Sequence, residues 1–350
     1  MRVGASLSLS GPFQRQGTQA HDGLRLWVDS AKGTRDGPPP RLIVLDDWSR
    51  ASLAQEHARR LLDEERVDVL VGPYSSGLVL AVAPIAAAAG VALWNHGGTS
   101  DVIFQQGWRH IVSVASPASD YLRGLPGWIR HRAPRASRVG ILHARSGTFA
   151  AQVARGAAEG ARSAGFVEIR DMAFESPLRD AGAVVRAAVE ADPDLLVGVG
   201  AFQDDVAIAR ERAALPAKTT LALVAAGLAA FGNEVGGLAE GIVGPSQWEP
   251  EAGETPLAGP DSGWFVDAFA RAFRRMPEYP AAQAFALGVI LGECRRRAGS
   301  LASADLLDAA RALETTTFYG GFRLDPSTGR QVGHGVRLVQ WQGGRKRLIS

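Results

Sequence analysis

The feature that most constrains the fold is the regular alternation, along nearly the whole chain, of short apolar runs with Ala-rich stretches. The apolar runs are typical of buried strands, and in the Ala-rich stretches apolar residues recur at i, i+3, i+4 and i+7, as in amphipathic helices. Strands that alternate with helices predict parallel sheets. We expect strands near 3–9, 41–46, 67–72, 91–95 and 111–115, then 138–143, 166–173, 195–200, 220–225 and 241–245, with helices at 18–32, 52–65, 77–89, 119–131, 147–164, 180–191 and 203–214.

Two successive series of five strands do not share one core economically, so the expected fold class is α/β, with two doubly wound parallel-sheet lobes. Three further helices near 262–275, 281–297 and 303–313 are too few for a third domain and should return to the first lobe. Short strands around Phe322, Val336–Trp341 and Leu348 should end the chain. The expected lobes are 1–116 with 247–318, and 117–246 with 319–350.

Composition argues against several classes of function. The 38 basic and 36 acidic residues leave a net charge of +2, so a role at nucleic acid or at a membrane surface has no support. Cys294 is the single cysteine, which excludes an intrachain disulfide and a thiolate metal cluster.

The common catalytic signatures do not occur either. No P-loop pattern is present, and Gly198-Val199-Gly200 lacks the third glycine of a dinucleotide site. The segment Gly72–Gly77 lacks the spacing of a nucleophile elbow. The seven histidines never fall at metal-ligand spacing, so surface or satisfied packing is expected for each. We therefore expect no catalytic residue, no cofactor and no metal.

Two loops stand out at the ends of predicted strands. Gly72-Pro73-Tyr74-Ser75-Ser76-Gly77 follows the third strand, and Asn95-His96-Gly97-Gly98-Thr99-Ser100-Asp101 follows the fourth. In an open parallel sheet, ligands bind beyond the carboxyl ends of the strands, where helix N-termini present N–H groups that bind anions. Ser76 and Thr99 in these loops are therefore candidates for binding a small anion. The alternative is that they only cap their helices.

Aromatic and acidic residues occupy matching positions in the second series. Phe149, Phe202 and Trp248 each follow a predicted strand and could form an apolar wall over a ligand, together with Trp94. Asp101, Asp204 and Asp205 are the acids near strand ends, and Asp204 is the candidate partner for a ligand ammonium group.

The order of these motifs resembles the leucine/isoleucine/valine-binding branch of the type I periplasmic binding proteins, receptors of ABC importers. The matching stretches are Leu9-Ser10-Gly11-Pro12-Phe13 with Gly17 and Asp22-Gly23, Leu45-Asp46-Asp47, Val69–Gly77, Ala83-Pro84-Ile85, Gly90-Val91 with Gly98-Thr99-Ser100, Ala191-Asp192-Pro193-Asp194, Gly237–Gly241, and Tyr319–Asp325. The resemblance implies two lobes joined by three crossovers, a ligand cleft between them, hinge closure on a small-molecule carboxylate, and delivery to a membrane permease.

The resemblance also implies which residues bind. The ligand's carboxylate and amine should be held by Ser75, Ser76, Gly97, Gly98 and Thr99, and Phe149 and Phe202 should contribute aromatic contacts from the second lobe. Three positions depart from the amino-acid binders. Gln16 stands where an aromatic residue is expected, Phe149 replaces a tyrosine, and Ala226 replaces the acid that holds the ammonium. A carboxylate ligand is expected, and these departures leave open whether it is an amino acid or an aromatic or aliphatic acid without an α-amine.

The resemblance places the protein, as a monomer, in the periplasm or anchored at the cell surface. The opening Met1-Arg2-Val3-Gly4-Ala5-Ser6-Leu7 is typical of a strand and not of a secretory leader. Two alternatives remain open: an intracellular ligand sensor of the same fold, which the missing leader favours, and an enzyme on a two-lobe α/β scaffold, which requires a nucleophile or cofactor site.

Overall fold

The computed structural model describes residues 1–32 and 38–350. These residues divide into two compact units, Met1–Ser116 with Gln247–Gly335, and Pro117–Ser246 with Val336–Ser350. The segment 319–335, which we expected in the second lobe, lies in the first unit. The reason is a set of buried hydrogen bonds, because Tyr319 donates to Gln247 and Gln331 donates to the carbonyl of Val114.

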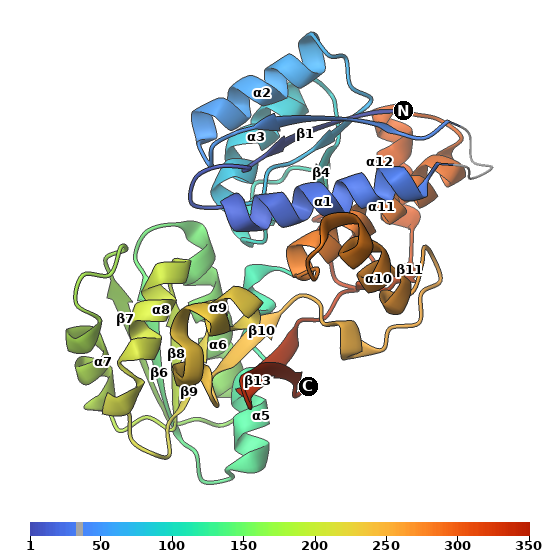
Figure 1. Ribbon diagram of the computed structural model, residues 1–350. Helices are drawn as coiled ribbons and strands as arrows, with labels where there is room; N and C mark the ends of the chain where they lie inside the picture. The colour runs from blue at the N-terminus through green and yellow to red at the C-terminus, as the bar shows by residue number, and fades with distance from the viewer. Residues whose placement is uncertain (33–37) are drawn as a thin grey trace. The chain divides into compact units, whose positions relative to one another are not determined.

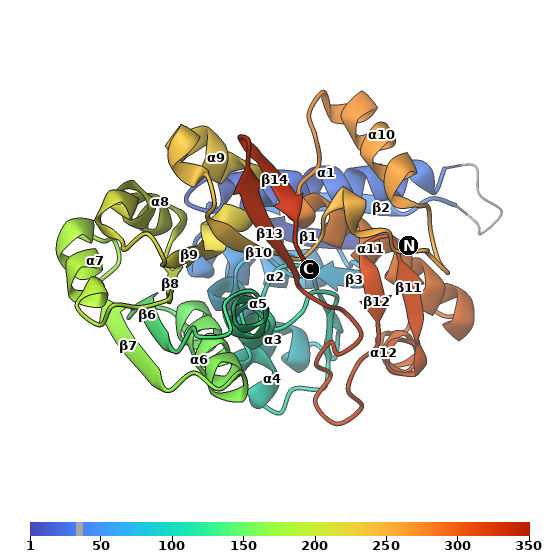
Figure 2. The ribbon, with the colours of Figure 1, turned by 90° about the horizontal axis from the view of Figure 1, so that it is seen from below.

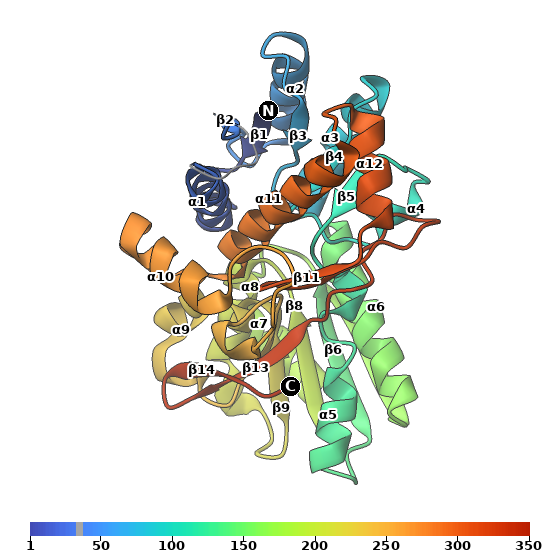
Figure 3. The ribbon, with the colours of Figure 1, turned by 90° about the vertical axis from the view of Figure 1, so that its right-hand side faces the viewer.

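The first unit is built on a five-stranded parallel sheet in the order β2-β1-β3-β4-β5 (Figure 3). β1 runs between β2 and β3, with Val3 opposite Leu42 on one side and Val69 on the other. The strand bounds are β1 (Arg2–Leu7), β2 (Arg41–Asp46), β3 (Val69–Val71), β4 (Leu93–Asn95) and β5 (Ile111–Ser113).

Helices cover both faces of this sheet, because its strands are apolar on both sides. Val3, Ala5 and Leu7 point into one core, and Leu70 and Leu93 point into the other. Helix α1 packs along α11 (Figures 1 and 3). The helices of this unit are α1 (Gln14–Ser30), α2 (Ala51–Asp63), α3 (Ser76–Ala88), α4 (Val102–Gln105), α10 (Ser262–Phe273), α11 (Tyr279–Ala298) and α12 (Ser303–Ala312). A hairpin of β11 (Thr315–Thr317) and β12 (Gly320–Phe322) follows α12.

The second unit is built on a seven-stranded sheet in the order β14-β13-β10-β9-β8-β6-β7 (Figure 2). The five strands from β10 to β7 in this order are parallel. β13 pairs with the β10 edge in antiparallel orientation, and β14 pairs with β13 in the same way. The bounds are β6 (Arg138–Ala144), β7 (Glu168–Phe174), β8 (Leu195–Val199), β9 (Thr220–Leu223), β10 (Val243–Ser246), β13 (Arg337–Gln342) and β14 (Arg345–Leu348).

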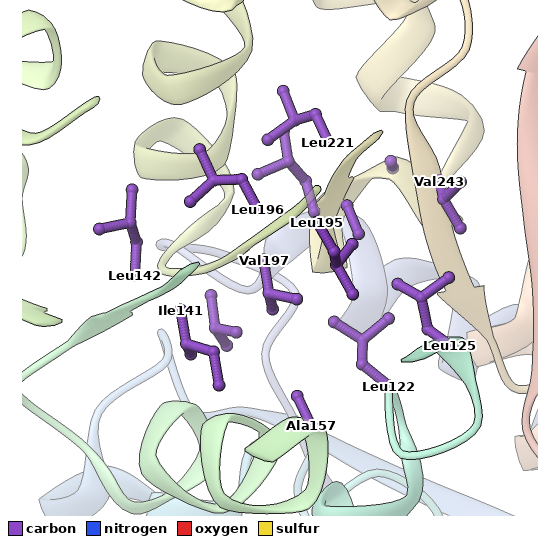
Figure 4. Close-up of a cluster of buried hydrophobic side chains, with 14 of the residues drawn as sticks. Leu122, Leu125, Ile141, Leu142, Ala157, Leu195, Leu196, Val197, Leu221 and Val243 are labelled. Atoms are coloured by element: carbon purple, nitrogen blue, oxygen red, sulfur yellow. The ribbon is translucent and has the colours of Figure 1, made fainter. Parts of the chain in front are cut away.

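One apolar cluster fills the second unit on both faces of the sheet (Figure 4). Leu195, Leu196 and Val197 lie in it with no exposed surface. Helix α6 covers one face, and α7 and α8 cover the other (Figure 3). The helices of this unit are α5 (Leu125–Arg132), α6 (Thr148–Ser163), α7 (Ala181–Val189), α8 (Phe202–Arg210) and α9 (Ala229–Val235).

The doubly wound α/β fold predicted from the sequence is confirmed, and each expected strand overlaps a strand of the structure. The expected helix at 119–131 is wrong in its first half. A short 3₁₀ turn at Ala118–Asp120 precedes α5, which begins at Leu125 with Pro126 at its second position, where proline starts a helix more readily than it continues one.

Candidate functional site

Two adjacent carboxylates at the end of β2 hold the loop between β1 and α1. Asp46 accepts hydrogen bonds from the backbone N–H groups of Leu9 (2.9 Å) and Ser10 (3.1 Å) and from the Ser10 hydroxyl (2.7 Å). Asp47, which is fully buried, accepts from the Ser8 hydroxyl at 2.6 Å. Burial alone would raise the pKa of Asp46, but the hydrogen bonds from Ser10, Leu9 and Trp48 outweigh it and lower that pKa below its usual value. The ionised carboxylate fixes the loop that leads into α1.

Gln16 lies in the first turn of α1 and is half-buried. Its Oε1 atom is buried and accepts no hydrogen bond from the part of the chain that the structure describes. Buried acceptors without a donor are uncommon in proteins. Gln16 is therefore suited to accept a hydrogen bond from a bound molecule.

Ser75 and Ser76 have different roles at the start of α3. Ser75 caps the helix, because its Oγ accepts from the N–H of Leu78 at 3.3 Å. Ser76 does not cap a helix. Its buried Oγ accepts from the N–H groups of Thr99 (3.1 Å) and Ser100 (2.9 Å) and so ties the β3–α3 loop to the β4–α4 loop.

The loop after β4 does not offer the free N–H groups that we predicted. The Oδ1 atom of Asn95 accepts from Gly97 at 3.2 Å and from Gly98 at 2.7 Å, while its Nδ2 donates to the Gly98 carbonyl and to the Ser113 hydroxyl. The prediction of free N–H groups in this loop is wrong, because the side chain of Asn95 already accepts hydrogen bonds from the N–H groups of Gly97 and Gly98. Gly97 is required here, since a Cβ atom would lie 2.7 Å from the ring of Tyr74.

Donors remain at the N-terminus of α3 and on Thr99. In the described chain the N–H groups of Ser76 and Gly77 donate no hydrogen bond, and the hydroxyl of buried Thr99 has no partner. The N-terminus of a helix of thirteen residues carries partial positive charge and binds anions. This end of the first sheet can therefore bind a small anion such as a carboxylate.

Two residues of β4 and its end are more deeply buried than expected. Trp94 has no exposed surface and packs in the core with Val112 and Phe285, so the prediction that it lines a ligand wall is wrong. His96 is also fully buried, and neither ring nitrogen has a hydrogen bond of good geometry among the described residues. Burial lowers the pKa of His96 to about 4, and the carbonyl of Gly72 offsets this only in part. The imidazole is neutral, and the expected satisfied packing of this histidine is not found.

The sequence reasoning missed an aromatic group beside these loops. The hydroxyls of Tyr74 and Tyr279 lie 3.4 Å apart, and the rings of Tyr74 and Phe13 have centroids 6.2 Å apart. Tyr279 is the first residue of α11, whose start is fixed to α1 because Gln19 bonds to the backbone of Met276 and Glu278. The Tyr279-Pro280 pair indicates the start of a helix in the sequence. It does not indicate that this helix start lies beside Tyr74.

In the second unit, Phe149 and Phe202 lie at the starts of α6 and α8, after β6 and β8. Phe149 packs edge-on against Tyr121, with ring centroids 5.2 Å apart and planes at 84°. Both phenylalanines are half-buried at the border of the core of this unit. Each keeps an accessible apolar surface at the carboxyl edge of its own sheet.

Asp204 is not available for the ammonium role proposed for it. Its Oδ2 atom accepts from the hydroxyl of Ser176 (2.5 Å) and the N–H of Ala201 (2.9 Å), and its Oδ1 accepts from the N–H of Leu178 (2.7 Å). The side chain is 3% exposed, so these bonds occupy the carboxylate. Asp204 joins the β7–α7 loop to the start of α8.

The neighbouring Asp205 connects two strand ends. It accepts from the N–H of Gly200 at 2.9 Å and of Ala225 at 2.8 Å. Burial raises the pKa of Asp205 to about 8, against the lowering effect of these N–H groups and with a further increase from the charge of Asp204. Ala226, where the resemblance led us to expect an acid, is fully buried in the core.

The structure thus joins Ser75, Ser76, Gly97, Gly98 and Thr99 into one network in the first unit, and Gln16 lies in the first turn of α1 in the same unit. Phe149, Phe202 and Asp204 belong to the second unit. Among residues 1–32 and 38–350, no group of three or more His, Cys, Asp or Glu side chains is placed to hold a metal ion. No helix in these ranges is both long and apolar enough to cross a membrane.

Comparison with known proteins agrees with the two-sheet fold. The chain is 24% identical over 238 residues to a Leu/Ile/Val-binding protein homolog of Brucella abortus, a match over 65% of this chain that spans only 58% of the relative. A leucine-binding protein of Thermotoga maritima has the same fold, with a TM-score of 0.87 at 19% identity, covering 100% of this chain and 98% of that one. A solute-binding protein of an ABC transporter from Rhodopseudomonas palustris, solved with benzoate, matches with a TM-score of 0.83 at 18% identity over 100% and 95% of the two chains.

The sequence profile of the periplasmic binding protein family matches residues 1–346. This match covers both units, and the structural relatives are solute-binding proteins with the same two-sheet fold. The chain is a member of the periplasmic binding protein family.

Proposed function

We propose that this protein is the extracytoplasmic solute receptor of an ABC importer and that it acts without catalysis. In this proposal the monomer closes its two units on a small carboxylate and delivers it to a membrane permease. The proposal is supported by membership of the family and by relatives whose names describe amino-acid or benzoate binding.

The observation that carries the carboxylate assignment is the pair of unsatisfied N–H groups at the start of α3, on Ser76 and Gly77, beside the Thr99 hydroxyl. A carboxylate has two acceptor oxygens and gains both hydrogen bonds and the helix dipole at such a position. Ser76 and Asn95 hold the surrounding turns, so these donors are preorganised and little ordering is needed on binding.

The ligand that fits best lacks an α-amine. A buried ammonium needs a carboxylate or several acceptors, because an unpaired buried charge is strongly unfavourable. The carboxylate of Asp204 is occupied by three hydrogen bonds, and Ala226 offers only a methyl group in the core. The hydrocarbon part of an aromatic or aliphatic acid can pack against the rings of Phe13 and Tyr74 or of Phe149 and Phe202. Leucine and valine would fit less well, because their ammonium group would lack a partner.

A thermal-shift screen tests this function, because a ligand that binds only the folded state raises the melting temperature. The panel contains benzoate, 4-hydroxybenzoate, hexanoate, leucine and valine, with benzamide, hexanamide and leucinamide as matched neutral controls. We expect at least one acid to raise the melting temperature, its amide to have no effect, and the amine-free acids to act at least as strongly as the amino acids. Stabilisation by amino acids alone would overturn the assigned ligand class, and equal shifts with acid and amide would overturn the carboxylate site.

A further inference from the structure

Three segments of chain pass between the two units, at residues 116–117, 246–247 and 335–336. On the first-unit side, all three are joined by a compact group of buried and partly buried hydrogen bonds. We call this group the glutamine brace, and it consists of Ser116, Gln247, Tyr319, Gln331 and His334.

Gln247 is the centre of the brace. Its Oε1 atom accepts from the N–H of Ser116 at 3.1 Å, and its Nε2 atom donates to the carbonyl of the same residue at 3.1 Å. Its backbone carbonyl lies 2.8 Å from Nε2 of His334, and its Oε1 also accepts from the hydroxyl of Tyr319 at 3.2 Å. The Ser116 hydroxyl donates to the His334 carbonyl at 2.9 Å and closes the connection among the three segments.

Stacking and a second glutamine complete the brace. The rings of Tyr319 and His334 stack with centroids 4.3 Å apart and planes at 6°. Gly320 allows this approach, because a Cβ atom there would lie 2.3 Å from Nδ1 of His334 and its φ is +144°. Gln331 donates to the carbonyls of Val114 and Gly321 and accepts from two N–H groups, so all its hydrogen-bonding capacity is used.

Two of the three crossing segments are also held to each other on the second-unit side, where Ser246 at the end of β10 pairs with Arg337 at the start of β13. Between the two fixed regions lie the Ser116-Pro117, Ser246-Gln247 and Gly335-Val336 peptide links. Gly335 lies in open space, since a Cβ atom there would contact nothing within 4 Å.

We propose that the glutamine brace is the fixed side of the hinge and that Gln247 is the residue that holds it together. The brace restricts the directions in which the three segments leave the first unit. Rotation of one unit against the other is therefore confined to the peptide links beyond the brace. Gln247 and Ser116 are 1% and 0% exposed. Removal of the Gln247 carboxamide would therefore leave the buried N–H and carbonyl groups of Ser116 without their hydrogen bonds. The inference rests on the proposed closure of the two units, and it concerns the unliganded protein.

The test measures distances between spin labels in the absence of ligand. Labels are attached to Ala304→Cys on α12 and Ala187→Cys on α7, two exposed positions in different units. Burial raises the pKa of the native Cys294 thiol to about 12, so this residue does not compete for the label. Gln247→Leu is compared with Gln55→Leu, which also replaces a glutamine but removes the hydrogen bond from Nε2 of half-buried Gln55 to the Ala81 carbonyl at 3.1 Å, far from the crossing segments in sequence.

We expect Gln247→Leu to broaden and shift the distance distribution relative to its parent. Tyr319→Phe should broaden it less because Gln247 keeps its hydrogen bonds to Ser116, and Gln55→Leu should leave it unchanged. Superimposable distributions for Gln247→Leu and Gln55→Leu would overturn the brace. If Gln247→Leu does not fold, an unchanged distribution for folded Tyr319→Phe would overturn it. Because no ligand is present, failure of the ligand screen would leave this result unaffected.

Discussion

Ser76 and Thr99 are linked at the same edge of the first sheet, but their hydroxyls have different partners. The Ser76 hydroxyl accepts from two backbone N–H groups, whereas the Thr99 hydroxyl has no partner in the described chain. Loss of the first therefore affects the folded state itself, and loss of the second affects only what binds there.

We expect Thr99→Val to weaken binding of the best acid from the screen by roughly 1–3 kcal/mol while the melting temperature without ligand stays almost unchanged. Ser76→Ala should lower that melting temperature as well, because two buried N–H groups lose their acceptor. Calorimetric titration and thermal melts of both variants separate the two effects. Unchanged affinity in Thr99→Val would show that the ligand binds elsewhere.

His96 makes stability depend on pH. Its pKa in the folded protein is about 4 and its ordinary value is 6.5, so between these values the unfolded chain binds more protons. Stability from this residue is fully present above pH 6.5 and is lost as the pH falls toward 4, by up to about 3 kcal/mol. Urea unfolding at pH 7 and pH 5 should show a smaller difference in His96→Leu than in the wild type, whereas His131→Gln, at an exposed position, should match the wild type. Equal differences in wild type and His96→Leu would contradict this assignment.

The residues that sequence reasoning placed correctly are those whose role is local. The Gly72–Gly77 and Asn95–Asp101 loops were recognised because they follow strands and contain glycine and hydroxyl residues. The role of Asn95 was missed because its partners, Gly98 and Ser113, depend on the curvature of the turn and on the neighbouring strand. Trp94 was misplaced because the sequence of an apolar strand does not show which distant helix covers it, here α11 with Phe285.

At the scale of elements, the carboxyl edge of the second sheet is held together by two consecutive acids at the start of α8. Asp204 binds the β7–α7 loop, and Asp205 joins the ends of β8 and β9. The sequence predicted these residues near a strand end, but their spacing fits a ligand contact and a loop contact equally well. The segments that they bind, at Ser176 and Ala225, are distant in the sequence.

Asp205 gives the second unit the opposite dependence on pH. Its folded pKa of about 8 lies above the ordinary 3.8, so the folded state binds more protons between these values and stability falls as the pH rises through this range. Asp205→Asn cannot ionise, so its stability relative to wild type should improve by a few kcal/mol, as an order of magnitude, between pH 5 and pH 8. Urea unfolding monitored at both pH values checks this. A constant difference between the two proteins would contradict it.

At the scale of the whole molecule, the alternation of strands and helices was enough to predict two doubly wound units, because each element reflects a local periodicity. The assignment of residues 319–335 was wrong for the same reason. Short apolar runs at the end of the chain fit either sheet, and the choice is made by Gln247 and Gln331, whose buried amides bond to Tyr319 and Val114. No periodicity encodes such a connection.

The central claim is that a small carboxylate, held through the first unit, draws the second unit onto it. A ligand shifts the equilibrium between open and closed forms only through contacts that differ between them, and in the proposed function contacts from both units would provide that difference. Small-angle X-ray scattering of the wild type, with and without a saturating concentration of the best acid from the screen, measures this directly. We expect a smaller radius of gyration with the acid and no change with its amide, whereas an unchanged radius at saturation would indicate a rigid scaffold and contradict the receptor mechanism.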